Sequence, residues 1–170
     1  MENPKENEMK VVIVSDTHLP RKGRGLPPLL QKDLMESDLI IHGGDFGTHD
    51  VYMEFMGYGE LIAVAGNVDD PELQSLLPKR RIIERRGMKI GITHGDGMGK
   101  TTEKRALEAF EDVDVDVIIF GHSHIPYSRF MKGVLLFNPG SPTDKRKLPY
   151  YSHGVLTIGD TWKIEHIFYK

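Results

Sequence analysis

Short runs of apolar residues alternate with amphipathic stretches along most of this chain. The runs are rich in β-branched residues and are bounded by Gly or Asp, and several lack alternating polar positions, as is typical of strands covered on both faces. We therefore predict strands over residues 11–14, 38–42, 60–65, 81–84, 88–93 and 115–120. Helices are predicted over residues 27–36, 48–57 and 100–112, the second capped by Thr48 and the third opened by Thr101-Thr102-Glu103.

After residue 130 the pattern is typical of antiparallel strands. These are predicted over residues 134–137, 154–158 and 161–169. Gly159-Asp160 suits a tight hairpin turn between the last two. Within the last strand, Trp162, Ile164 and Phe168 are predicted to share the buried face. The pattern therefore predicts an α/β protein in which a mostly parallel half is followed by an antiparallel half.

Composition narrows the class of protein. The chain has 170 residues, of which 39% are hydrophobic and 28% charged, values typical of a soluble globular domain. No apolar run approaches the roughly 18 residues that cross a bilayer, and the N-terminus is too polar for a signal peptide. The absence of cysteine excludes disulfides, a thiolate nucleophile and Cys-ligated zinc, and the net charge of −3 argues against a broad nucleic-acid-binding surface. We expect a cytoplasmic protein with one domain over residues 10–170 behind a disordered tail at residues 1–9.

Polar residues follow five of the predicted strands directly. They are Ser15-Asp16-Thr17-His18, Gly43-Gly44-Asp45, Gly66-Asn67, His94-Gly95-Asp96 and Gly121-His122-Ser123-His124. Ligands of such layered folds collect beyond the carboxyl ends of the parallel strands, and glycine there allows the backbone to approach them closely. Because residues i and i+2 of an extended segment point the same way, we expect Asp16 with His18, and His122 with His124, to converge.

The residue types at these strand ends indicate a metal site. Carboxylate, imidazole and amide ligands together suit Mn²⁺, Fe²⁺, Zn²⁺, Co²⁺ or Ni²⁺. Seven candidate ligands exceed what one ion needs, whereas two ions about 3.5–4 Å apart, bridged by one carboxylate, would use all seven and clamp a displacement at phosphorus. The spacing by itself does not fix the reaction. We expect the remaining histidines to be structural: His42, His49, His153 and His166. We expect Met53, Phe55 and Met56 to pack in the core or an interface.

With these motifs in this order, the chain resembles the calcineurin-like metallophosphoesterase superfamily. Asn138-Pro139-Gly140-Ser141 and the short length make it similar to the small phosphodiesterase branch, which is related in fold to the retromer scaffold subunit. The resemblance implies two packed mixed β-sheets flanked by helices, an α/β/β/α sandwich. It also implies a hydrolase, with diesters favoured over monoesters, in which a hydroxide bound to a dinuclear metal centre attacks a small phosphate ester.

The resemblance further implies a role for each candidate residue. The first ion would be held by Asp16, His18, Asp45 and His124, and the second by Asp45, Asn67, His94 and His122. Asp45, Asn67 and His94 would carry the catalytic roles, with Asp45 as the bridge. Mn²⁺ is the expected metal, with Ni²⁺, Zn²⁺, Fe²⁺ and Co²⁺ as alternatives. Members of the family associate to various degrees, so a homo-oligomer is left open.

One departure from the family pattern and two alternative functions remain. Many members have His after the Asn, where it protonates the leaving group; here Val68 stands there, and Asp69 is a candidate acid in its place. The stretch from His94 to Thr101 resembles a phosphate-binding P-loop of a nucleotide triphosphatase, but that motif needs Gly where His94 stands. A catalytically silent scaffold or protein-binding module of the same fold is the other alternative. The basic stretch Lys145-Arg146-Lys147 either contacts a substrate phosphate or is a solvated loop.

Overall fold

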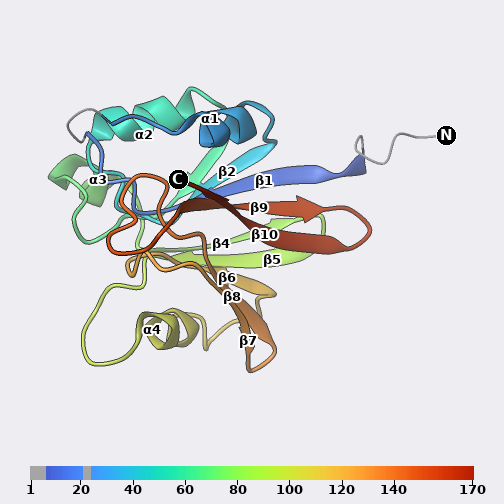
Figure 1. The fold of residues 1–170 in the computed structure, drawn as a ribbon. Coiled ribbons are helices and arrows are strands. Elements are labelled where there is room, and N and C mark those ends of the chain that lie inside the picture. Colours follow the sequence, from blue (N-terminus) through green and yellow to red (C-terminus); the bar gives the residue numbers. More distant parts are fainter. Residues whose placement is uncertain (1–6, 21–23) are drawn as a thin grey trace.

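Two five-stranded β-sheets pack face to face in the computed structural model, which describes residues 7–20 and 24–170 (Figure 1). The first sheet has the order β10 (Trp162–Tyr169), β9 (Tyr151–Ile158), β1 (Met9–Val14), β2 (Leu39–His42) and β3 (Leu61–Ala63). The second has the order β4 (Arg80–Arg85), β5 (Met88–Thr93), β6 (Val117–Ile119), β8 (Val134–Asn138) and β7 (Tyr127–Met131). The predicted fold class is confirmed. Of the predicted N-terminal tail, residues 1–6 lie outside the described residues, and β1 begins at Met9.

Helices cover the outer faces of both sheets, as Figure 1 shows. The first sheet carries α1 (Pro28–Met35) and α2 (His49–Met56), with α3 (Pro71–Leu76) beside it, and the second carries α4 (Thr102–Glu108). Fully buried residues such as Ile13 and Ile90 fill the space between the sheets, whereas Leu30 of α1 and Ala106 of α4 pack against the outer faces. None of the described helices is long and apolar enough to cross a bilayer.

The predicted division into a parallel and an antiparallel half is wrong in part. The last two strands, β9 and β10, are antiparallel as predicted. In the first sheet β1, β2 and β3 are parallel and the antiparallel strands lie at one edge only, whereas in the second sheet β5, β6 and β8 form a parallel centre with an antiparallel strand at each edge. Strand β8, predicted to be antiparallel, runs parallel to β6 and antiparallel to β7. The chain then returns to the first sheet, where β9 pairs with β1. Apolar patterning reports burial and not direction, so it could not show this return.

Two elements were not predicted. Helix α3 begins with a signal that the sequence does contain: Asp70 accepts a hydrogen bond from the backbone N of Leu73 (2.9 Å), and Pro71 occupies the first helical position. Strand β7 is a largely exposed edge strand, so it lacks a buried run, although Lys132-Gly133 forms a two-residue turn with positive φ at both positions.

The end of the chain and the helix caps follow the prediction in part. The hairpin at Gly159-Asp160 is confirmed by the antiparallel pairing of β9 with β10. Trp162 and Ile164 pack against the core, but Phe168, predicted to share their buried face, is 52% exposed and lies against Tyr150. Thr101 accepts a hydrogen bond from the backbone of α4, whereas Thr48 precedes α2 without a side-chain cap.

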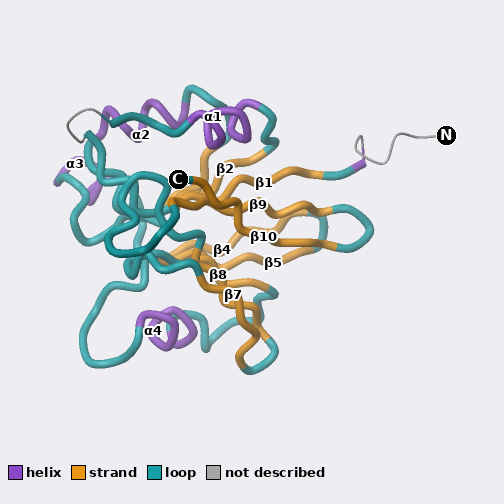
Figure 2. The backbone as a smooth tube through the Cα atoms, in the orientation of Figure 1, coloured by secondary structure: helices purple, strands orange, loops and turns teal. Residues whose placement is uncertain are grey.

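The parallel strands determine where the polar loops lie. The loops that follow β1, β2, β3, β5 and β6 emerge at one end of the two sheets, on the left in Figures 1 and 2. Figure 2 shows that this end consists almost entirely of loops. Each polar strand-end motif is therefore carried to the same edge of the sandwich, as the sequence predicts.

Candidate metal centre

The backbone at the strand ends adopts an uncommon conformation. Five of the candidate residues have positive φ: Asp16 (58°), His18 (47°), Asp45 (59°), His122 (71°) and His124 (63°). A residue other than Gly in this region is uncommon, and such strain persists where the surrounding structure enforces it, most often at functional sites. The predicted convergence of Asp16 with His18 is confirmed, since Asp16 Oδ1 lies 3.7 Å from His18 Nε2. The backbone that carries these side chains is left-handed, however, and not extended as expected.

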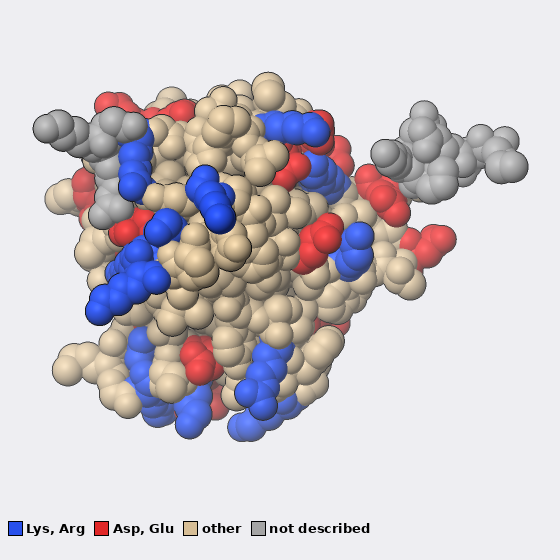
Figure 3. Space-filling view, viewed as in Figure 1, with Lys and Arg blue, Asp and Glu red and all other residues tan. Residues whose placement is uncertain are grey.

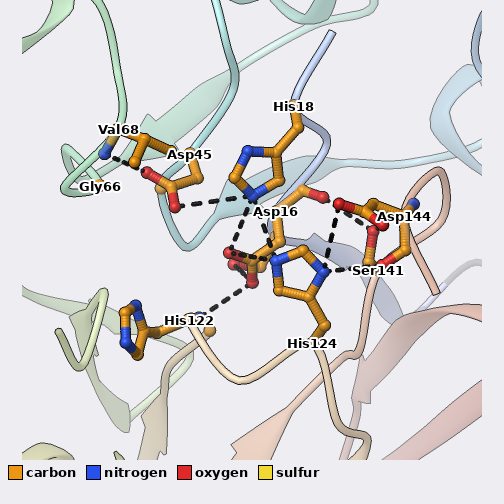
Figure 4. Close-up of polar contacts among 12 residues, drawn as sticks. Asp16, His18, Asp45, Gly66, Val68, His122, His124, Ser141 and Asp144 are labelled. Carbon is orange, nitrogen blue, oxygen red and sulfur yellow. Dashed lines mark hydrogen bonds and ion pairs between the residues drawn. The ribbon is translucent and has the colours of Figure 1, made fainter. Parts of the chain in front are cut away.

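Two buried carboxylates form the centre of the cluster, and each has one oxygen fixed by the protein. Asp16 Oδ2 accepts hydrogen bonds from Ser15 Oγ (2.9 Å) and from the backbone N of His122 (3.0 Å). Asp45 Oδ1 accepts one from the backbone N of Val68 (2.9 Å; Figure 4). These bonds leave Asp16 Oδ1 and Asp45 Oδ2 facing the histidines.

Two histidines are oriented in the same way by backbone carbonyls. His94 Nδ1 donates to the carbonyl of Gly43 (2.8 Å), and His124 Nδ1 donates to the carbonyl of Asp144 (2.7 Å). Each Nε2 is consequently left to face the carboxylates: His94 Nε2 lies 3.0 Å from Asp45 Oδ2, and His124 Nε2 lies 3.5 Å from Asp16 Oδ1. A hydrogen bond that fixes the other ring nitrogen is typical of metal-binding histidines.

His18 completes the cluster from the end of β1. Its Nε2 lies 3.1 Å from His124 Nε2 and 3.6 Å from Asp45 Oδ2. Five of the seven predicted ligands thus meet in two groups of atoms, each within 4.8 Å: Asp16, His18 and His124; and Asp16, Asp45 and His94. The residue common to both groups is Asp16, whereas the family resemblance makes Asp45 the bridge.

The other two predicted ligands lie at the margin of this cluster. The His122 ring lies 5.3 Å from that of His94, centroid to centroid, and is turned away from the His18–His124 pair (Figure 4). Asn67 is exposed and lines a cavity of about 230 Å³ together with Lys79 and Asp96. His122 and His124 therefore do not converge on one spot as predicted, and point to different sides of the cluster.

The pKa shifts of Asp16 and His94 show that the cluster stabilises positive charge. Burial raises the pKa of Asp16, but the nearby imidazoles of His18, His94 and His124 outweigh this effect and lower it to about 2. Burial lowers the pKa of His94, but the carboxylates of Asp45 and Asp16 outweigh it and raise the pKa to about 9. A proton on His94 thus partly balances the negative charge of two buried carboxylates. A divalent cation would balance the same charge and would displace that proton.

Two buried atoms of the cluster make close ion-pair contacts but no well-formed hydrogen bond. Across residues 7–20 and 24–170, Asp16 Oδ1 and His94 Nε2 are the buried side-chain atoms without a hydrogen bond, and they lie 3.5 Å from His124 Nε2 and 3.0 Å from Asp45 Oδ2 respectively. Both atoms face the centre of the cluster, and both are oxygen or nitrogen donors of the kind that divalent transition ions bind. The donor set therefore fits metal ions.

Comparison with known proteins agrees with this geometry. The model of the calcineurin-like phosphoesterase superfamily domain matches residues 9–161 of the chain. The chain belongs to this superfamily. A probable metallophosphoesterase of Methanocaldococcus jannaschii is 34% identical over 139 residues, which cover 81% of this chain and 70% of that relative.

Solved structures show the same fold. An archaeal phosphodiesterase, 25% identical, has a TM-score of 0.70, and the alignment covers 95% of this chain and all of that one. Vps29 of Cryptosporidium parvum, 17% identical, has a TM-score of 0.76 over 96% of this chain and 98% of that one. Membership of the superfamily supports a hydrolase that uses divalent metal ions.

Residues other than the seven predicted ligands support the site. Ser141 Oγ donates to the carbonyl of Asp16 (2.7 Å) and accepts a hydrogen bond from the backbone N of Asp144 (2.8 Å). The loop that orients His124 is thereby tied to the turn that carries Asp16 (Figure 4). Sequence reasoning quoted Ser141 only as part of a motif, and it missed Asp144, which contributes a backbone carbonyl and so leaves no residue-type signal.

Asp69 holds loops together and is poorly placed to be the missing acid. Its Oδ2 accepts hydrogen bonds from the backbone N of Asp45 (3.0 Å) and of Gly66 (2.7 Å), and its Oδ1 accepts one from Gly47 (3.2 Å). Both oxygens of this buried carboxylate are thus engaged by the main chain. Burial raises the pKa of Asp69, but these contacts give it a role in positioning Asp45, and they do not direct it at a leaving group.

The four histidines outside the motifs have structural contacts. His42 is buried, accepts a hydrogen bond from the backbone N of Gly44 and stacks on Phe46. His153 Nε2 donates to Asp33 Oδ2 (2.6 Å), and His166 donates to a backbone carbonyl. His49 lies 3.8 Å from Glu72 at the start of α2.

Contacts and burial also show what becomes of the P-loop-like stretch and of the three residues that were expected to pack in the core or an interface. Lys100, considered above as part of a P-loop, is paired with Glu108 at 2.6 Å, so its charge is not directed at a bound anion. Phe55 is fully buried in the core, whereas Met53 and Met56 are about half exposed on the same helix.

Proposed function

We propose that this chain is a phosphodiesterase that works with two divalent ions, Mn²⁺ being the ion of choice. The observation that carries the proposal is the position of the buried Asp16 carboxylate between two groups of candidate ligands, His18 with His124 on one side and Asp45 with His94 on the other. One ion would be held by Asp16, His18, Asp45 and His124. The other would be held by Asp45, His94, His122 and Asn67. The fold and the family membership support this assignment.

The residues of the chain would divide the work of the reaction. Bound ions supply an activated water and stabilise the charge that develops on the phosphoryl oxygens. The carbonyls of Gly43 and Asp144 fix the orientation of the His94 and His124 rings, and the backbone N of Val68 fixes the carboxylate of Asp45. The Val68 side chain is 55% exposed beside the site and carries no proton. Leaving groups that depart without protonation, such as p-nitrophenolate, are therefore expected to be preferred.

The surroundings of the cluster favour a diester as substrate. One cavity of about 230 Å³ adjoins it on the Asn67 side, and another of about 300 Å³ adjoins it at His124. A phosphate bound between them would have space for a substituent on either side, as a diester requires. The archaeal phosphodiesterase with the same fold, 25% identical, supports the same substrate class.

A scaffold without catalysis is the second candidate. The likeness to Vps29 shows that this fold occurs in a protein named for vacuolar sorting. A scaffold, however, has no need to bury two carboxylates and several imidazoles together, with a carboxylate oxygen and an imidazole nitrogen that form no hydrogen bond. The geometry therefore favours the hydrolase.

The test is hydrolysis of bis(p-nitrophenyl) phosphate by metal-stripped protein, before and after addition of Mn²⁺, Ni²⁺, Zn²⁺, Fe²⁺ or Co²⁺. We expect turnover to return with metal, and to be faster for this diester than for p-nitrophenyl phosphate. Circular dichroism checks that the stripped protein is folded. Folded protein that hydrolyses neither ester with any of these ions would contradict the proposal and favour the scaffold.

A further inference from the structure

A cavity of about 300 Å³ lies beside His124, outside the cluster of carboxylates and histidines. Its volume is at the lower end of the range of ligand pockets, roughly 300–1,000 Å³. Ile125 and Leu148 supply apolar walls, and Ile125 is 53% exposed although it directly follows the buried His124. An exposed isoleucine beside a polar site is well placed to contact the apolar part of a ligand.

The same cavity is lined by three consecutive cations. Lys145 lies over the ring of Tyr151 (5.5 Å), and Arg146 and Lys147 are exposed. Within the residues that the structure describes, the side chains of Arg146 and Lys147 form no hydrogen bond or ion pair. Figure 3 shows Lys and Arg side chains gathered at the end of the molecule where the loops lie. This positive charge is local, because the net charge of the whole chain is −3.

The loop that carries these cations is fixed to the candidate metal centre. His124 Nδ1 donates to the carbonyl of Asp144, and Leu148 N donates to the carbonyl of Lys145 (3.0 Å). Between these bonds Arg146 is held at a φ of 51°, a conformation that is uncommon for a residue other than Gly. The loop that orients His124 therefore also determines where the Arg146 guanidinium is anchored, so a group bound there has a defined place relative to the cluster.

We propose that this cavity binds one arm of the diester, and that this arm is a nucleoside carrying a further phosphate. Ile125 and Leu148 would contact the nucleoside, and Arg146 would bind the terminal phosphate, since a guanidinium matches the geometry of phosphate oxygens. The inference rests on the proposed phosphodiesterase function and adds the chemical class of its substrate. Arg146 and Ile125 are specificity-determining residues in this account.

The test compares two substrates that differ only in the terminal phosphate: thymidine 5′-(p-nitrophenyl phosphate) with and without a 3′-phosphate. In each, water adds to phosphorus, the bond to the aryl oxygen breaks and p-nitrophenolate leaves. With Mn²⁺ present, we expect kcat/KM to be about tenfold higher for the 3′-phosphorylated ester, as for one charge-assisted contact at an exposed site. In Arg146→Ala this ratio is expected to fall to about one.

Arg129→Ala is the matched control, because Arg129 is an exposed arginine on β7 that does not line the cavity. It should keep the tenfold ratio. Ile125→Ala should lower kcat/KM for the thymidine ester relative to methyl p-nitrophenyl phosphate, whose small arm cannot fill the cavity. A ratio of one in the unmodified protein, or an unchanged ratio in Arg146→Ala, would overturn the inference while the phosphodiesterase stands. Absence of turnover with every diester would overturn both.

Discussion

Replacing Asp45 by Ala or by Asn is expected to reduce Mn²⁺-supported hydrolysis of bis(p-nitrophenyl) phosphate by at least about 10³-fold. Loss of an outer-shell partner of a metal ligand commonly costs about 10–100-fold, and loss of a shared ligand should cost more. Asp45 Oδ2 lies 3.0 Å from His94 Nε2 and 3.6 Å from His18 Nε2, so it faces both sides of the cluster. The measurement is kcat/KM at saturating Mn²⁺, beside the number of ions bound per chain.

The two Asp45 variants separate chemistry from folding. Asn is nearly isosteric with Asp and keeps an oxygen that can accept the hydrogen bond from the backbone N of Val68, so Asp45→Asn should fold and melt like the unmodified protein. Asp114→Ala is the matched control, because Asp114 is exposed and belongs to neither group of candidate ligands. An Asp45→Asn variant that retains a tenth or more of the activity, by our roughly tenfold criterion, would contradict the assignment of this carboxylate.

Replacing Gly66 by Ala should inactivate the protein without removing any functional group. A Cβ at this position would overlap with the backbone N and the carboxylate of Asp45, approaching its Cγ to 2.6 Å. Overpacking of this kind costs about 1–3 kcal/mol of stability. Since a shift of about 1 Å in a catalytic group can cost roughly 10²-fold in rate, we expect at least that loss in kcat/KM.

Gly25→Ala is the control for this substitution. A Cβ on Gly25 would meet no heavy atom within 4 Å, and its φ lies outside the left-handed region. Its activity and melting temperature should match those of the unmodified protein. Full activity of Gly66→Ala would show that Asp45 is not held by this contact, or that its position does not matter to the reaction.

Much of the site could be predicted because its residues occupy a topological position that the sequence makes visible. Five runs of buried β-branched residues are followed by Asp, Asn or His, four of them with Gly alongside, and the parallel strands of both sheets bring these ends to one edge. What could not be predicted is how the side chains converge. Asp16 and His18 meet because both have positive φ, and an apolar pattern carries no information about that conformation.

The parts of the site that sequence reasoning missed are mainly backbone atoms. The carbonyls of Gly43 and Asp144 orient His94 and His124, and any residue supplies a carbonyl. Asp69 is a different case, because its side chain was noticed as a candidate acid while its structural contacts were missed. Only the three backbone N–H groups around its carboxylate show that it joins loops that are distant in the sequence.

The central claim is that two ions act together at the Asp16–Asp45 cluster. The most direct measurement is a titration of metal-stripped protein with Mn²⁺ in which bound ions and hydrolysis of bis(p-nitrophenyl) phosphate are followed in the same samples. We predict that two ions bind per chain and that turnover appears with the second. Turnover that is complete with a single bound ion, or binding of two ions without any turnover, would contradict the account.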